Sequence, residues 1–264
     1  MTNVNSINNT IRDNFFVVGG TVEIGNDATS GAISIGTGAA ARTTTIGNAT
    51  GATSVVIDCG TGALNLGANA IARTTTLGNT TGASVLALRY GTGDFTLASA
   101  SGTAISASDA GAVQYPLQPC FAAYVSTTIT DVTGDGSFYG PIIFDATSFN
   151  VGADYSTSTG NFTAPVTGKY LFTCAVDFSC DSSHTSMQCS FLATSREHRF
   201  STFNPGVMPR ADNGSVTLCG SCLADLTAAD TMHIMFYVSG GSKTVDVQGS
   251  AGYTICFFEG WLIG

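Results

Sequence analysis

Apolar and polar residues alternate along short stretches of this chain, and turn residues separate the stretches. Alternation with a period of two places one set of side chains on each face of a strand. In the C-terminal part it predicts strands at 121–125, 141–144, 160–164, 169–178, 186–193, 215–223, 232–238 and 253–261. Many short strands separated by turns are typical of a β-sandwich or jelly roll, so we expect an all-β fold with almost no helix.

The N-terminal part contains an internal repeat. The sequence Arg-Thr-Thr-Thr-Ile-Gly-Asn at 42–48 returns as Arg-Thr-Thr-Thr-Leu-Gly-Asn at 73–79, and the Gly-Thr-Gly at 60–62 returns at 91–93 with the same offset. Similarity at a fixed period indicates a repeat architecture. Within the copies, short strands are expected at 54–57, 63–66, 85–88 and 94–97.

Each repeat has too few apolar side chains to bury a core alone. Three chains wound together would share one, so we expect a trimeric, intertwined β shaft over residues 21–98. A single-chain β-solenoid and a flexible low-complexity linker remain alternatives. The repeat resembles the shaft repeats of phage tail fibres and of fibre proteins from large DNA viruses. Residues 1–20 are then an N-terminal anchor or tail, and 99–119, small, polar and followed by prolines, a linker or neck.

Composition narrows the classes of partner. The net charge is −9, with 9 basic and 18 acidic residues, and only 10% of residues are charged. A chain this acidic repels nucleic acid and anionic lipid, so neither is expected as a partner. No apolar run is long enough to cross a membrane, and the polar start has no secretory signal pattern. We therefore expect synthesis without a signal peptide and a final location on the surface of a virion or particle.

The C-terminal part also carries an ordered set of motifs. They are Phe-Ala-Ala at 121–123, Asn-x-Gly…Tyr at 150–155, Gly-x-Phe-x-x-Pro-x-x-Gly-x-Tyr-x-Phe at 160–172, and Phe-x-Gly-x-Leu at 258–262. This pattern resembles the C1q domain of the TNF-like jelly-roll superfamily. The resemblance implies a C1q-like jelly-roll head over residues 120–264.

The resemblance has further implications. Family members are compact trimers whose chain termini lie together at the base, so a homotrimer is expected. One departure is Ala229, where the family has Gly before Asp230. The aromatic residues of the motifs are expected in the core or the trimer interface, namely Phe121, Tyr155, Phe162, Tyr170, Phe172, Phe258 and Trp261.

No motif for catalysis is present. The chain lacks a Gly-x-Ser-x-Gly elbow, a phosphate-binding loop and a His-Glu-x-x-His pair, so we do not expect an enzyme. Cys219-x-x-Cys222 lies in a predicted strand, where its two side chains point to opposite faces. A zinc site would need a second pair, for which His184 with Cys180 and Cys189 is the candidate on paper. We instead expect mostly free, buried thiols, a surface histidine and no metal.

Candidate ligand-binding residues lie in the loops at 127–138, 181–185 and 196–212. The last loop gathers most of the head's positive charge, with Arg196, His198, Arg199 and Arg210, and could meet a glycan or an anionic receptor. A solvated, salt-bridged loop is the alternative. Asp131 and Asp135 lie in a polar loop of the kind that can hold calcium, but two carboxylates are too few to assign a site, so no cofactor is expected.

Two functions fit these features. The first is a non-enzymatic, trimeric surface fibre or spike, attached through its N-terminus, whose head binds a host-surface receptor or glycan and gains avidity from three copies. The second is a structural appendage or capsid decoration in which the C1q-like head drives trimerisation. A secreted C1q-like signalling protein fits less well, because the chain has no signal peptide and no collagen repeat.

Overall fold

The computed structural model describes residues 33, 35, 43–46, 54–59, 61, 63–66, 74–78, 86–208 and 214–264. The chain forms two compact units, Met1–Val85 and Leu86–Gly264. No strand is assigned to the described residues of the first unit, including the expected strands at 54–57 and 63–66. Their apolar side chains are exposed, and Val56 is 86% accessible. The expected anchor at 1–20 and most of the expected shaft lie outside the described residues.

The second unit is built from β-strands, which confirms the all-β prediction. Its only helical elements among the described residues are the short 3-10 turns η1 (Val151–Ala153) and η2 (Pro205–Val207). The strands are β1 (Phe95–Ser99), β2 (Gly102–Ala107), β3 (Val113–Gln114), β4 (Cys120–Tyr124), β5 (Ile129–Thr133), β6 (Phe138–Tyr139), β7 (Ala146–Asn150), β8 (Phe162–Thr163), β9 (Gly168–Ser179), β10 (Ser186–Ala193), β11 (Glu197–Phe203), β12 (Ser215–Leu226), β13 (Thr231–Ser239), β14 (Val245–Val247) and β15 (Phe257–Leu262).

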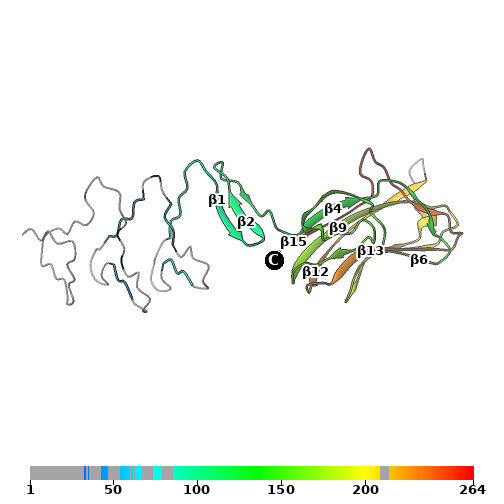
Figure 1. Cartoon of the computed structure of the whole chain (residues 1–264). Helices are drawn as coiled ribbons and strands as arrows, with labels where there is room; N and C mark the ends of the chain where they lie inside the picture. Colours follow the sequence, from blue (N-terminus) through cyan, green and yellow to red (C-terminus); the bar gives the residue numbers. More distant parts are fainter. Residues whose placement is uncertain are drawn as a thin grey trace, which may run out of the picture. The chain divides into compact units, whose positions relative to one another are not determined.

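Strands β4 to β15 form a sandwich of two antiparallel sheets (Figure 1). One sheet has the order β11-β10-β13-β6, and β8 also pairs with β13. The other has the order β5-β14-β9-β15-β4-β7, and β12 pairs with the free side of β9. Strands β1 to β3 form a separate three-stranded sheet before the sandwich. The region expected to be a linker or neck, 99–119, therefore contains β2 and β3.

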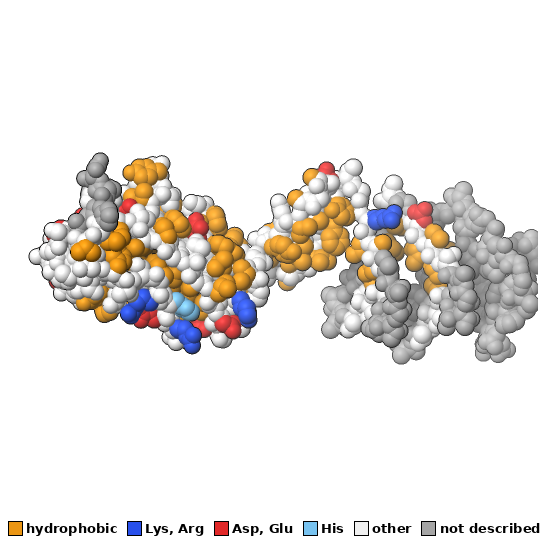
Figure 2. Space-filling view, turned by 180° about the vertical axis from the view of Figure 1, so that it is seen from behind, with side chains coloured by type: hydrophobic (Ala, Val, Ile, Leu, Met, Phe, Trp, Pro, Cys, Tyr) orange, Lys and Arg blue, Asp and Glu red, His pale blue; other side chains and the backbone are white. Residues whose placement is uncertain are grey.

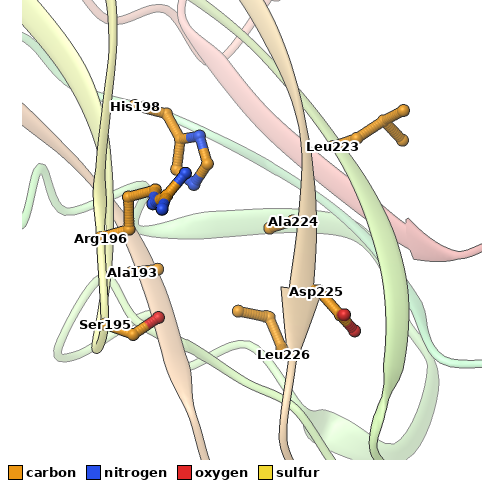
Figure 3. Close-up of a pocket in the computed structure, with 8 residues that line it drawn as sticks. All are labelled: Ala193, Ser195, Arg196, His198, Leu223, Ala224, Asp225 and Leu226. Carbon is orange, nitrogen blue, oxygen red and sulfur yellow. The ribbon is translucent and has the colours of Figure 1, made fainter.

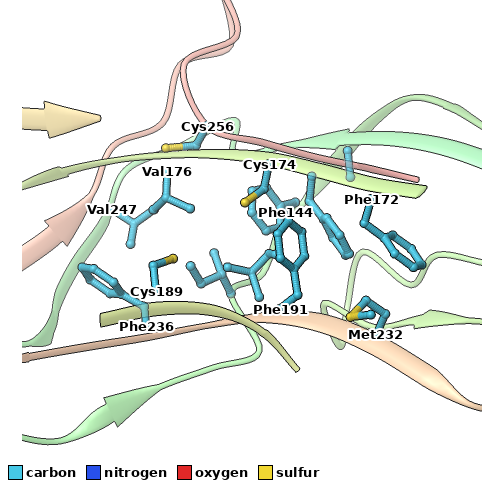
Figure 4. Close-up of a cluster of buried hydrophobic side chains, with 14 of the residues drawn as sticks. Phe144, Phe172, Cys174, Val176, Cys189, Phe191, Met232, Phe236, Val247 and Cys256 are labelled. Atoms are coloured by element: carbon cyan, nitrogen blue, oxygen red, sulfur yellow. The ribbon is translucent and has the colours of Figure 1, made fainter. Parts of the chain in front are cut away.

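Aromatic rings fill the space between the two sheets of the sandwich (Figure 4). Strand β9 shows why the sequence folds this way, because Tyr170, Phe172 and Cys174 alternate with more accessible residues and point inward. The ring of Phe121 lies 4.9 Å from the rings of both Tyr155 and Phe258. Offset and edge-on ring pairs of this kind stabilise a core beyond the area they bury.

Two predictions about the strands of the head were wrong. The apolar run at 141–144 forms no strand, because Pro141 has no N–H to donate to a strand ladder. The Ile142 N–H donates to the Ile234 carbonyl at 3.0 Å. The segment 196–212, expected to be a loop, contains the edge strand β11. Its sequence does not alternate clearly, since an edge strand with one solvated face needs few apolar residues.

Candidate functional site

The two edge strands β11 and β12 border an open side of the sandwich. Each pairs with a single neighbour, β11 with β10 and β12 with β9, so one side of each strand has no ladder partner among the described strands. A pocket of about 420 Å³ lies between them. It is lined by Ala193, Ser195, Arg196, His198, Leu223, Ala224, Asp225 and Leu226.

Basic side chains form one wall of this pocket. Arg196 precedes β11 and His198 lies on it, and both side chains reach into the space in front of β12 (Figure 3). On β12 the side chains of Leu223 and Asp225 lie on the far side of the strand (Figure 3). The alternation along β12 explains this arrangement, because Ala224 is buried in the core while Leu223 and Asp225 are exposed.

The two described arginines of this region differ in their partners. Arg199 forms an ion pair with Glu197, with the Arg199 Nη2 2.9 Å from the Glu197 Oε1. Hydrogen bonds from Ser190 and then from Arg199 lower the pKa of Glu197. Within the described part of the chain, the Arg196 side chain has no ion pair or hydrogen bond, so it is available to an anionic group. Arg210 lies outside the described residues.

The two aspartates considered for calcium have different hydrogen-bond partners. The Asp131 N–H donates to the Asp246 carboxylate at 2.8 Å. The Asp135 carboxylate accepts from the Ser137 hydroxyl at 2.6 Å, and this bond is the main cause of its lowered pKa. No group of three His, Cys, Asp or Glu side chains able to hold a metal occurs among the residues that the structure describes.

The outer face of the β12-β9-β15-β4-β7 sheet is a second surface with exposed apolar side chains. Cross-strand pairing places Cys120, Trp261, Leu171 and Leu223 in one row. The next row contains Phe149, Ala122, Glu259, Thr173 and Ser221. Phe149 is 52% and Leu223 63% accessible in the single chain. Of the seven motif aromatics, Trp261 lies on this outer face and the other six are buried.

The histidine expected at the surface is fully buried instead. His184 lies in the β9–β10 loop, where its Nδ1 accepts from the Asp181 N–H at 3.2 Å. Its Nε2 lies 3.2 Å from the Ser242 carbonyl oxygen in the β13–β14 loop. The prediction was wrong because the polar local sequence does not show that several loops converge on this ring.

The cysteines of the head are free thiols in the described structure. Cys219 is exposed, whereas Cys222 packs against the core, which confirms that the two side chains point to opposite faces. Burial raises the pKa of Cys222 and of Cys256 to about 12, so both remain protonated and unreactive at neutral pH.

Arg196 and His198, which the sequence suggested as ligand-binding residues, line this pocket, but sequence reasoning missed the strand that completes it. The alternation that predicted a strand at 215–223 in fact continues to Leu226, and this extension brings Ala224, Asp225 and Leu226 to the site. No signal in the sequence shows that β11 and β12 lie on the same open side.

Across the described ranges, no helix is long and apolar enough to span a membrane.

Comparison with known proteins places this head in a family. None of the curated proteins compared matches the chain. Among solved structures, the globular domain of zebrafish complement 1qA protein is similar, with 19% identity, 56% of this chain and 98% of that chain covered, and a TM-score of 0.37. Murine APRIL at pH 8.5 is similar with 10% identity, coverage of 55% and 99%, and a TM-score of 0.36. The C1q domain model matches residues 121–263, more than half of the sequence, and the chain therefore belongs to the C1q domain family.

Proposed function

We propose that this protein is a non-enzymatic, homotrimeric surface fibre of a virion or similar particle, attached through its N-terminal end. In this proposal the C1q-like head binds a host-surface receptor or glycan in the pocket between β11 and β12. The observation that carries the assignment is the unpaired Arg196 guanidinium beside His198 in a pocket of about 420 Å³. Ligand pockets in proteins usually have volumes of about 300–1,000 Å³.

The outer sheet face with Phe149 and Trp261 supports contacts between copies of the head. Phe149 is 52% exposed in the single chain. Exposed apolar faces of this kind mark contact surfaces, and a contact on this face leaves the pocket between β11 and β12 open. Family members with this domain are typically trimers, which favours a ring of three.

The first unit also has exposed apolar side chains, which support a shaft shared between chains. Ile46, Val56 and Leu64 are all more than half exposed in the single chain. Apolar residues at equivalent positions of successive repeats would gain burial only from other chains. We infer that three chains bury these residues together along the fibre.

The chemistry of the pocket favours a ligand that carries a carboxylate or sulfate. A guanidinium binds a carboxylate through two parallel N–H donors, and such charge-assisted bonds are stronger than neutral ones. The Ser195 hydroxyl can donate or accept a hydrogen bond with a sugar hydroxyl. Acidic glycans satisfy these requirements together, and three heads per fibre would raise weak single-site affinity by avidity.

A glycan array with the full-length chain tests this function, with Arg196→Ala as the test variant and Arg199→Ala as the matched control. We expect binding to acidic glycans and a loss of about ten- to a hundredfold in Arg196→Ala, because hydrogen bonds to charged groups contribute about 1.5–3 kcal/mol. Arg199→Ala should bind within about threefold of the wild type, since Arg199 is held by Glu197. Equal binding by the wild type and both variants would refute the assignment of the pocket.

The alternative function is purely structural, with the head as the trimerisation module of an appendage. The exposed apolar row on the outer sheet face is the observation that favours it. Light scattering of the wild type, Arg196→Ala and Arg199→Ala separates the two functions. If Arg196→Ala loses the trimeric mass, the pocket belongs to a contact between copies. If the mass is unchanged and only glycan binding is lost, the pocket is a recognition site.

A further inference from the structure

The three-stranded sheet before the head has one apolar face and one polar face. Its strand register places Phe95, Ala107 and Val113 opposite one another, and Leu97 opposite Ile105. Directly opposed residues point to the same face of a sheet. These five residues therefore form one continuous apolar surface, here called the neck face. The register equally places Thr96, Ser106 and Gln114 in a row on the opposite face.

The neck face is only partly covered by the described chain. Leu97 is 50% and Val113 56% exposed, and Figure 2 shows hydrophobic side chains gathered over this small sheet. The ring of Tyr90 stacks on Phe95 with their centroids 6.1 Å apart, so it shields one corner of the face. An antiparallel sheet with a single apolar face normally packs that face against another layer. Three short strands without such a layer are of marginal stability.

The charge pattern indicates what the missing layer is. No residue of β1, β2 or β3 carries a charge. Around a three-fold axis every side chain meets its own copies, so a charged residue there would face like charges. A face without charges avoids this repulsion and is complementary to itself.

The connection to the head supplies the second argument. Only residues 115–119 separate β3 from β4, and five residues span at most about 17 Å. The Gln118 side-chain amide donates to the Leu262 carbonyl at 2.5 Å, which fastens this short connection to the end of β15. Three heads in one ring would therefore hold their three neck sheets at high effective concentration.

We propose that the neck faces of three copies pack against one another around the fibre axis and form a second trimeric core directly before the head. This inference rests on the trimer of the proposed function and extends it to β2 and β3, which the repeat does not include. It assigns Leu97, Ile105 and Val113 to an interface between chains. It leaves Thr96, Ser106 and Gln114 in solvent.

Photo-cross-linking of the full-length chain tests the neck face directly. A benzophenone amino acid would replace Leu97 in one variant and the neighbouring Thr96 in the control. We expect covalent dimers and trimers on a denaturing gel from position 97 and at least tenfold less from position 96. Equal yields at the two positions, or an adduct within the same chain at position 97, would overturn the proposal.

Light scattering of the same samples distinguishes this inference from the proposed function. A trimeric mass without cross-links at position 97 would reject the neck interface and leave the trimeric head standing. A monomeric mass would reject both.

A second pair of variants tests the neck face by its resistance to proteolysis. Val113→Asp should speed proteolytic cleavage within residues 95–114 at least tenfold at unchanged mass, whereas Gln114→Asp should not; equal cleavage rates would again reject the interface.

Discussion

Gly260 on β15 is a position where one added methyl group should disturb the aromatic core. A Cβ built there would lie 2.5 Å from the Cδ1 of Phe172 and 2.7 Å from the Cε1 of Phe121. Non-bonded carbon atoms prefer about 3.5–4.0 Å, so each ring would have to move by about 1 Å. Both rings are fully buried, and other aromatic rings surround them, so neither has free space to enter.

We expect Gly260→Ala to lower the free energy of unfolding by about 2 kcal/mol. Overpacking of a core costs roughly 1–3 kcal/mol, and replacing a glycine in a strand returns about 0.5–1 kcal/mol of backbone entropy. With two rings displaced, the upper part of the first range applies. For a unit of this size the loss corresponds to a fall in Tm of about 4–8 °C.

Thermal and urea unfolding of the full-length chain would measure this loss. The protein concentration has to be fixed, because the stability of an oligomer depends on it. Gly252→Ala is the matched control, since its nearest neighbouring atom lies 3.9 Å from the new methyl group. If Gly260→Ala unfolds within 0.5 kcal/mol of the control, roughly the spread of ordinary surface substitutions, then the two rings do not require a glycine and the packing argument fails.

Three further predictions concern single residues of the head. His184→Ala should lower the free energy of unfolding by about 2–4 kcal/mol in urea, because it removes a fully buried ring and leaves a cavity in its place; a loss below 1 kcal/mol would contradict this role. Ala229→Gly should raise the free energy of unfolding by roughly 0.5 kcal/mol and so raise Tm slightly, because Ala229 has a φ of 75° that glycine adopts without strain. A lower Tm would argue against strain at this position. Since the folded pKa of Glu197 is lowered, its contribution to stability is complete above its ordinary pKa of 4.5 and is lost as the pH falls through the folded value. Ser190→Ala should therefore raise the pKa of Glu197 in an NMR titration, and an unchanged value would exclude the Ser190 hydroxyl as its cause.

Much of the head could be predicted because its strands are amphipathic or carry motif residues. The expected strand at 169–178 is β9 (Gly168–Ser179) within one residue at each end, since inward aromatics alternate there along the whole strand. The motif glycine at Gly260 was part of the resemblance, and the structure gives its physical reason in two neighbouring rings. Local alternation therefore determines which face of each strand enters the core.

The parts that could not be predicted depend on contacts between distant segments. β11 was read as a loop because an edge strand needs apolar residues on one side at most, and its sequence contains Glu197, Arg199 and Ser201. The pocket arises only because β11 and β12, which belong to different sheets, end on the same open side. His184 is buried by loops that are distant in sequence, so its neighbours in the sequence give no sign of its burial.

Apolar side chains left exposed in the single chain recur along its described part, and they support each of the proposed contacts between copies. Ile46 and Val56 in the first unit, Leu97 and Val113 on the neck face, and Phe149 on the head sheet are all at least half exposed. Single exposed apolar residues are ordinary, but faces of them on strands and repeats mark contact surfaces. Copies of the same chain would cover all three regions at once, because each copy brings the same faces in the same order. If the chain forms the proposed fibre, unfolding should begin in the region with the least shared area, and raising the chain concentration should stabilise every region together.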